Sequence, residues 1–449
     1  MKFTSRVDGP LSGGGSTRRQ FLRAATGALT GGALRSLAAR AEKPQRGRAK
    51  EPPSWRVHDV AKIPQGYQVA VADVNADGRL DILALSSEES IVEWYENPSW
   101  KSRAITTKTR KNISLAPLFH EGYPERGLAL ASDFALEQSE QGGSIWWCEA
   151  PNLPESEWSL RRIGQIPTSH RLRWADLHGD GRLALIDAPI VGAGAKPPDY
   201  KVGARLTWFE MPEILLRGHA VGAKEPAEWT AHLIDDPLTV VHGLQILDWD
   251  GDGRDEILTA SFEGVHLFHA WGQGTDLRWR KTQLAAGYEP ATTGAKGDVA
   301  LRRGSSEIGV GKVGGQRFLA TIEPWHGDQV AVYFEDEDTQ KGKLWNRHVI
   351  DSTFRDGHAL ACGDLDGDGS DEIVAGYRGP GTSLYVYYAK GGPGTGWERQ
   401  TLDTEIAASG VTLADINGDH RLDIVCIGAS TGNVKWYENM LSRSVIGRA

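Results

Sequence analysis

Five short segments of the chain repeat one pattern of oxygen-bearing side chains. Asp or Asn occupies most of the alternate positions, a glycine usually follows, and an acidic residue often stands at the ninth position. This spacing is that of an EF-hand-like calcium loop. The next residues are apolar or β-branched, which predicts a strand and not the exit helix of an EF-hand. The segments are DVNADGRLD (73–81), DLHGDGRLA (176–184), DWDGDGRDE (248–256), DLDGDGSDE (364–372) and DINGDHRLD (415–423).

Two further patterns occur seven times each. A Trp is followed five residues later by an aliphatic residue, from Trp55 to Trp397, and an alternating aromatic segment such as VEWYEN (92–97) recurs equally often. Each unit therefore has a strand before the Asp loop, a strand after it, an aromatic strand and a Trp strand. Seven such units predict an all-β fold, a seven-bladed β-propeller of four-stranded blades. Because the first Trp strand precedes every loop, we expect it to join the last blade and close the ring.

These repeats resemble the FG-GAP/VCBS repeat family, which is also found in integrin α chains. The resemblance covers residues 54–440 and implies the propeller fold. It leaves the function open, because propellers of this kind serve adhesion, binding and catalysis.

The first 41 residues differ from the rest of the chain. TRRQFL (17–22) precedes a weakly apolar run that ends in a small-residue cleavage pattern at Ala39-Arg40-Ala41. We interpret residues 1–41 as a twin-arginine signal peptide, 42–53 as a linker and 441–449 as a tail. The apolar run is too short and too polar to be a stable membrane span. The sequence thus predicts export to the periplasm or the exterior of a bacterium.

Charge and cysteine content narrow the possible partners. Residues 1–41 hold seven Lys or Arg and one Asp, so the remainder carries a net charge of −15. An acidic protein of this kind argues against a nucleic-acid partner. Cys148, Cys362 and Cys426 fall in strands of different units, and we expect them to be buried packing residues rather than disulfides.

Four of the five loops have a full set of calcium ligands. A hard cation requires several oxygens around one tight turn, and the ninth-position carboxylate completes the set from the next strand. The remaining loop, at 176–184, has His178 and Ala184 at two ligand positions, which argues against a hard cation there. His420 replaces a usual glycine and is expected in left-handed space. The predicted structural calcium ligands are Asp73, Asn75, Asp77, Asp81, Asp248, Asp250, Asp252, Glu256, Asp364, Asp366, Asp368, Glu372, Asp415, Asn417, Asp419 and Asp423.

Histidines recur on the opposite face of the expected ring. In each of the five units that have the loop, we compare the residue six positions before the first loop Asp. These residues are, in chain order, Tyr67, His170, His242, His358 and Ser409. His326, in a loop that opens on the same face, adds a fourth imidazole. We therefore expect His170, His242 and His358 to hold zinc or another divalent metal, or to form a metal-free acid–base site, with His326 as base or fourth ligand.

Neighbouring segments supply groups that suit a carbohydrate. The aromatic residue Trp325, together with Tyr67 and Glu323, is predicted to bind a sugar or glycan. Glu263, Tyr377 and Arg378 join His242 and His326 as candidate catalytic residues. Long insertions at 132–143, 187–205 and 285–304 lie on this face, where elaborated loops usually carry function.

A narrower resemblance supports this interpretation. The segments EGVHLF (263–268), IEPWHGDQVAVY (322–333) and 347–379 look like the propeller domain of the aldos-2-ulose dehydratase (1,5-anhydrofructose dehydratase) family. The resemblance implies a lyase that removes water from a keto-sugar by β-elimination at the propeller centre. The family's cupin domains have no counterpart after the last blade.

Two other functions remain open. One is a non-catalytic, calcium-stabilised propeller that binds glycan or protein. The other is a polysaccharide lyase that uses the same histidines on uronate polymers.

Overall fold

The computed structural model describes residues 52–119, 126–152, 155–212, 228–290, 302–392, 394 and 396–441. The predicted signal peptide and most of the linker and tail lie outside these residues. Among the residues described, no helix has the length and apolar character needed to cross a membrane. The only helix assigned within them is the short 3-10 helix η3 (Thr339–Lys341).

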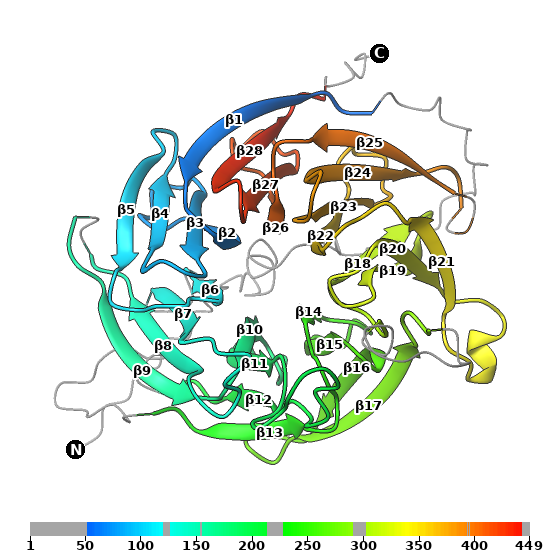
Figure 1. Cartoon of the computed structure of the whole chain (residues 1–449), viewed down its shortest axis with the longest axis horizontal. Coiled ribbons are helices and arrows are strands. Elements are labelled where there is room, and N and C mark those ends of the chain that lie inside the picture. Colours follow the sequence, from blue (N-terminus) through cyan, green and yellow to red (C-terminus); the bar gives the residue numbers. More distant parts are fainter. Residues whose placement is uncertain are drawn as a thin grey trace, which may run out of the picture.

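Seven four-stranded antiparallel sheets surround a central axis, which confirms the predicted seven-bladed propeller (Figure 1). The first strand of each blade lies at the axis and the fourth at the rim. Blade 1 comprises β2 (Gly66–Ala72), β3 (Asp81–Ser86), β4 (Val92–Glu96) and β5 (Lys101–Thr106). Blade 2 comprises β6 (Ser114–Leu118), β7 (Gly127–Ser132), β8 (Ser144–Glu149) and β9 (Ser159–Gln165). Blade 3 comprises β10 (Ser169–Ala175), β11 (Ala184–Pro189), β12 (Leu206–Phe209) and β13 (Ala231–Asp235).

The other four blades follow the same order. Blade 4 comprises β14 (Gly243–Leu247), β15 (Glu256–Ser261), β16 (Gly264–Trp271) and β17 (Arg278–Ala285), and blade 5 comprises β18 (Ile308–Val313), β19 (Gln316–Glu323), β20 (Gln329–Phe334) and β21 (Asn346–Asp351). Blade 6 comprises β22 (Gly357–Gly363), β23 (Glu372–Tyr377), β24 (Ser383–Ala389) and β25 (Trp397–Asp403). Blade 7 comprises β26 (Ala408–Ala414), β27 (Asp423–Gly428), β28 (Asn433–Asn439) and β1 (Trp55–Lys62). In the seventh blade, β1 is the rim strand and pairs with β28 along its length.

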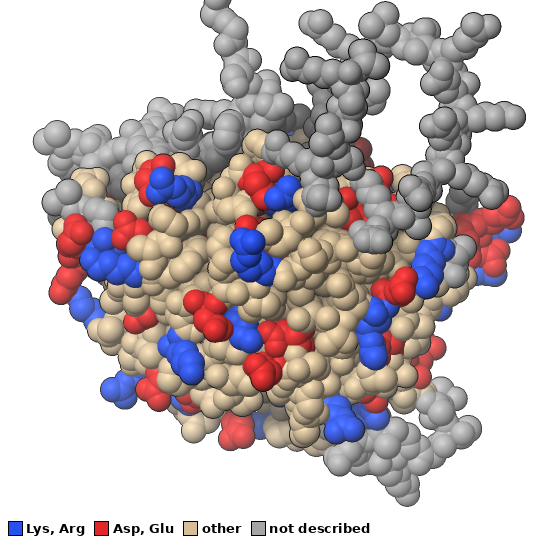
Figure 2. Space-filling view, turned by 90° about the horizontal axis from the view of Figure 1, so that it is seen from above, with Lys and Arg blue, Asp and Glu red and all other residues tan. Residues whose placement is uncertain are grey.

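The core lies between neighbouring blades. The second strand of six blades is buried at every residue, because both faces of each sheet pack against the next sheet. The repeated Trp positions fill these interfaces: the ring of Trp229 lies 6.2 Å from that of Trp147 in the preceding blade. The three cysteines are free and buried, as predicted. Acidic and basic side chains are intermixed over the flank shown in Figure 2.

Candidate functional site

One irregularity recurs at the start of the inner strand in four of the seven blades. In blades 1, 3, 6 and 7, the pairing of the inner strand with its neighbour shifts register at Tyr67, His170, His358 and Ser409. Such bulges redirect a side chain relative to a regular strand. The residue two positions earlier has a positive φ in blades 1, 3, 4 and 6, at Gln65, Thr168, Val240 and Asp356. The repeated turn and bulge thus bring these side chains to one face, opposite the Asp loops.

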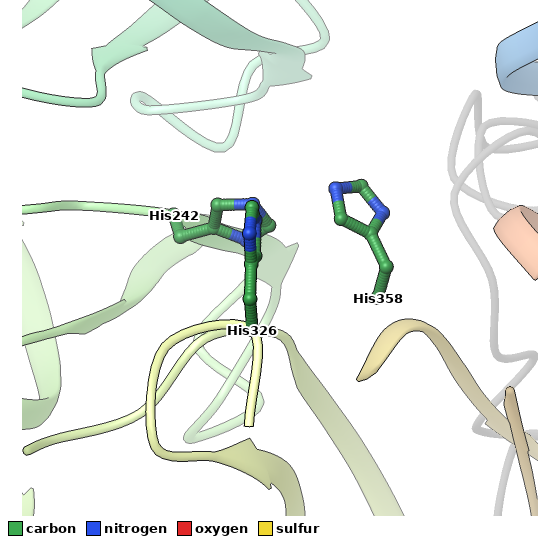
Figure 3. Close-up of side chains that lie close together, drawn as sticks. All are labelled: His242, His326 and His358. Atoms are coloured by element: carbon green, nitrogen blue, oxygen red, sulfur yellow. The ribbon is translucent and has the colours of Figure 1, made fainter. Parts of the chain in front are cut away.

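Three imidazoles from three blades meet near the axis. His242 precedes β14, His358 lies in β22, and His326 lies between β19 and β20; the three approach one another in Figure 3. Each offers a nitrogen, and these nitrogens all lie within 4.8 Å of one another. His242 Nε2 and His326 Nε2 are 3.1 Å apart. Two nitrogens bound tetrahedrally to zinc would be about 3.3 Å apart, so this spacing suits one ion.

An oxygen stands behind each of the three rings. Nδ1 of His242 lies 3.1 Å from Glu307 Oε1, Nδ1 of His326 lies 3.4 Å from Asp356 Oδ1, and Nδ1 of His358 lies 2.5 Å from the carbonyl oxygen of Ser409. For His242 and His358, an acceptor at Nδ1 favours the tautomer that carries its proton there and leaves a lone pair at Nε2. This is the arrangement found behind histidines that bind metals. At His326 the donor Arg378 Nη2 also lies 3.4 Å from Nδ1 and favours the opposite tautomer.

His170 takes a different role from the one predicted. Its ring lies 4.7 Å from that of His242, but its Nε2 is 2.7 Å from Tyr67 Oη and accepts a hydrogen bond from Arg171 Nη1 at 3.1 Å. That nitrogen is therefore occupied, and His170 does not belong to the convergent group of three. Tyr67 Oη also lies 3.2 Å from His358 Nε2, so the phenol links His170 to the group. We refer to His242, His326 and His358 as the histidine trio.

Burial sets the protonation of the site. It lowers the pKa of His242 to about 4, although the nearby Glu307 opposes the shift. Burial, reinforced by neighbouring positive charges, holds the pKa values of His170, His326 and His358 well below the usual range. Burial raises the pKa of Glu307, but Arg171 and His242 outweigh this effect and lower it to about 2. The imidazoles are consequently neutral, which is the form that coordinates a metal.

Aromatic residues from the insertions border the trio. The ring of Trp325 lies 4.9 Å from that of His326 and contacts Tyr200, from the insertion in blade 3. Phe134, from the insertion in blade 2, lies 5.7 Å from His170. The buried indole N–H of Trp325 has no hydrogen-bond partner. These contacts place Trp325 where the sequence predicted a substrate-binding residue.

Three other predicted site residues do not meet the trio. Glu323 has no exposed surface and is held by Ser305, Thr321, Tyr333 and Arg347, so it stands apart from the trio. The hydroxyl of Tyr377 donates to the Gly381 carbonyl, and the ring packs on Phe354. Glu263 accepts hydrogen bonds from the backbone and hydroxyl of Thr239, which fixes its own loop. Buried networks and turns, which local sequence does not reveal, occupy these groups.

Arg378, one of the predicted site residues, lies beside His326. Its Nη2 is 3.4 Å from His326 Nδ1 and 3.0 Å from Asp356 Oδ1. Asp356, Arg171 and Glu307 are functional candidates that the sequence analysis missed. Arg171 Nη2 lies 2.5 Å from Glu307 Oε1, so one carboxylate contacts both a guanidinium and His242. The signal in the sequence is position: Arg171 and Asp356 stand within two residues of His170 and His358, and Glu307 directly precedes the inner strand β18.

The Asp loops on the other face are not equivalent. Among the described residues, carboxylates come together as potential ligands in blade 4 (Asp248, Asp250, Asp252) and blade 6 (Asp364, Asp366, Glu372). The carboxylates of the blade 1 and blade 7 loops do not meet the same criterion. There the ninth-position residues Asp81 and Asp423 each accept two backbone N–H groups. His420 has a φ of 67°, the left-handed conformation expected of it.

The fold and this face define a propeller with a histidine-lined centre, and comparison with known proteins agrees. A family model described as FG-GAP-like repeat matches residues 364–426. A second, described as aldos-2-ulose dehydratase, beta-propeller domain, matches residues 142–336, a range that contains His170, His242, Glu307 and His326. Both resemblances predicted from the sequence are therefore confirmed.

One curated relative is aldos-2-ulose dehydratase from Phanerodontia chrysosporium. It is 29% identical over 256 residues, which are 53% of this chain and 26% of that protein. The matched part thus spans about a quarter of the length of the relative.

Proposed function

We propose that this protein is a sugar-processing lyase that removes water from a keto-sugar at the histidine-lined centre of the ring. The observation that carries the proposal is the trio itself. Each of three neutral imidazoles offers a nitrogen within 4.8 Å of the other two, and each has an oxygen near its Nδ1. The likeness to the propeller domain of aldos-2-ulose dehydratase supports the same chemistry.

The trio fits one zinc-type divalent cation. Three protein ligands leave a position open for substrate, as in catalytic rather than structural zinc sites. A cation there would polarise the carbonyl of a keto-sugar and stabilise the enolate that forms when the neighbouring carbon loses its proton. His242, His326 and His358 would hold it, and Glu307, Asp356 and the Ser409 carbonyl would orient them.

Tyr67 is the group best placed to move the proton. Its hydroxyl lies between His170 Nε2 and His358 Nε2, and Arg171 Nη1 donates to it at 3.3 Å. Tyr67 would take the proton from carbon on its hydroxyl oxygen as its own proton passes along the hydrogen bond to His170 Nε2. The electrons of that C–H bond then form the C=C bond as the adjacent C–O bond breaks. The departing hydroxide would take a proton from Tyr67 and leave as water, and the proton held by His170 would return to the tyrosine oxygen.

The charges favour a neutral sugar over a uronate polymer. The guanidinium of Arg171 is paired with Glu307, and that of Arg378 is paired with Asp356. Neither cation is left free to neutralise a row of uronate carboxylates. The guanidinium of Arg378 would instead donate hydrogen bonds to hydroxyl groups, while the Trp325 ring packs on the sugar.

Calcium completes the proposal on the opposite face. In blade 6, Asp364, Asp366 and Glu372 supply oxygens around one turn, which is the donor set that calcium prefers. Such an ion would stabilise the turn between β22 and β23 and take no part in the reaction.

Incubation of the purified protein with keto-sugars and, separately, with uronate polysaccharides would test the function by the appearance of enone absorbance. We expect turnover of a keto-sugar after loading with Zn²⁺, and loss of at least about 100-fold in His358→Ala, which removes one of the three ligands. Circular dichroism and thermal unfolding of the variant would show whether the ring remains folded.

The outcomes separate the alternatives. Turnover of the polymers alone would support a polysaccharide lyase. No turnover of either class, with glycan binding that survives His358→Ala, would replace the proposal with a non-catalytic binding propeller.

A further inference from the structure

The Asp loop of blade 4 differs from the others by a histidine that faces it. The aromatic strand β16 pairs Phe268 with Ile257, so the next residue, His269, lies beside the loop. The same register places Glu96, Tyr388 and Glu438 at this position in blades 1, 6 and 7. Blade 4 is therefore the only one of these four loops with an imidazole at this position.

The imidazole is close to two loop carboxylates. His269 Nδ1 lies 3.0 Å from Glu256 Oε1 and 3.8 Å from Asp250 Oδ2. One potential ligand atom from each of these three residues lies within 4.8 Å of the others. Asp250 also belongs to the group formed with Asp248 and Asp252, so the two groups share a carboxylate. The loop thus presents up to four carboxylates and one nitrogen.

Glu256 lacks the second backbone donor that its counterparts in blades 1 and 7 have. The residue is only 1% exposed, its Oε2 accepts from the backbone N–H of Trp249 at 2.7 Å, and its Oε1 accepts no hydrogen bond from the backbone and faces the His269 imidazole at 3.0 Å. In blades 1 and 7 the corresponding second oxygens accept the backbone N–H of Asn97 and Asn439. A cation between the imidazole and the buried carboxylate would satisfy this oxygen.

We propose that the blade 4 loop binds a borderline divalent cation of the zinc type through Asp250, Glu256 and His269, in contrast to the oxygen-only loop of blade 6. Imidazole suits zinc and its neighbours in the transition series, whereas calcium takes oxygen ligands. The ion would tie β16 to the turn between β14 and β15. It would also brace blade 5, because Arg317 Nη2 donates to the Trp249 carbonyl at 2.7 Å and stacks on its ring.

This site lies on the face opposite the histidine trio and does not depend on the proposed function. A simple ion pair between His269 and Glu256 is the competing explanation. That pair would also satisfy the carboxylate, but it would bind no metal and would show no preference between zinc and calcium.

Diffraction from crystals of the full chain soaked in equal concentrations of Zn²⁺ and Ca²⁺ would locate each ion by anomalous scattering at the zinc edge. We expect a zinc signal about 2.0–2.2 Å from Nδ1 of His269 and from oxygens of Asp250 and Glu256. We expect no zinc signal in the blade 6 loop.

Two variants separate this site from the trio. His269→Tyr installs the residue that blade 6 has at this position and should weaken zinc binding at the loop by at least about 10-fold, since even indirect partners contribute that much. Zinc at the trio should be unaffected by it. His358→Ala should have the opposite pattern, losing zinc at the trio and keeping it at the loop. In a solution titration, each variant should bind one equivalent fewer than the parent protein.

Calcium in the blade 4 loop under these conditions would overturn the proposal, as would an empty loop. A zinc signal there that persists in His269→Tyr at unchanged affinity would also overturn it, because the nitrogen would then have no part in the selection. The same maps would also show whether zinc is absent from both sites or from the trio alone.

Discussion

At the scale of single residues, the site depends on oxygens behind the histidines as much as on the histidines. Glu307 Oε1 faces both His242 Nδ1 and Arg171 Nη2. It therefore favours the His242 tautomer with the proton on Nδ1 and also pairs with the guanidinium of Arg171. Its lowered pKa, about 2, keeps it ionised at neutral pH. A metal ligand oriented in this way gains basicity at Nε2. Glu307 is thus a positioning residue.

Glu307→Gln should weaken zinc binding at the trio by about 10- to 100-fold, because a neutral amide is a poorer acceptor for His242 Nδ1. Competition with a chromophoric chelator would measure the affinity. Glu93→Gln makes the same chemical change on β4, where the carboxylate contacts only Tyr95 and Ser102 among the described side chains, and should leave the affinity unchanged. Equal affinities in the two variants would contradict the role of Glu307.

Asp187 makes the stability of blade 3 depend on pH. It is fully buried, and its Oδ1 accepts from Ser169 Oγ at 2.8 Å while Oδ2 has no hydrogen-bond partner. Burial raises the pKa of Asp187 to about 8 from its usual 3.8. The folded protein therefore keeps a proton that the unfolded chain releases above about pH 4. The contribution of this group to stability is complete below that pH and is lost as pH rises towards 8.

Asp187→Asn should remove this dependence. The difference in free energy of unfolding between the variant and the parent should increase by at most about 1.4 kcal/mol per pH unit between pH 4 and 8, in favour of the variant, and then level off. Urea unfolding at several pH values would measure it. Asp59→Asn, at an exposed position of β1, serves as the control. A difference that stays constant across this range would show that Asp187 is not protonated in the folded protein.

At the scale of elements, the same loop pattern has two structural roles. In blades 1 and 7 the ninth-position Asp is short and accepts backbone N–H groups with both oxygens. In blades 4 and 6 the longer Glu leaves its carboxylate near the loop Asp side chains, where it can act as a ligand. The ninth-position Asp of blades 1 and 7 is thus held by hydrogen bonds to the backbone, whereas the ninth-position Glu of blades 4 and 6 lies among potential ligands.

Asp81→Ala tests the first of these roles. It leaves the N–H groups of Val74 and Asn97 without their acceptor, at a cost of about 1–3 kcal/mol for each. We expect the same loss of stability in calcium and in EDTA, measured by urea unfolding. Asp77→Ala, in the exposed part of the same loop, should cost much less. A penalty that appears only in calcium would instead identify Asp81 as a ligand.

At the scale of the whole molecule, the ring converts seven local repeats into one site. Blades 3, 5 and 6 contribute His170, His326 and His358, which are up to 188 positions apart in the chain, yet their rings lie near that of His242. Only an arrangement in which all inner strands border one axis can achieve this. The rim strand β1, from the start of the propeller, pairs with β28 from its end.

A chain that begins at residue 64 would lack β1 and expose the edge of β28. We expect a lower Tm and concentration-dependent light scattering, because an unpaired strand edge associates with other edges. A chain that begins at residue 52 keeps β1 and should unfold like the full-length protein. Equal Tm and scattering in the two chains would show that β1 contributes little to the ring.

The repeat by itself determined the fold of this protein. Loop, aromatic and Trp patterns recur at fixed spacing, and such local periodicity specifies strands and their number. It also indicated the face on which the histidines lie, because alternate turns of a blade open on opposite faces. The tertiary structure decided which groups meet. It placed His326 in the trio and His170 behind Tyr67, brought Glu307 to His242, and buried Glu323 in a network of its own. These outcomes depend on bulges and on contacts between blades, which involve residues far apart in the chain, so no local pattern records them.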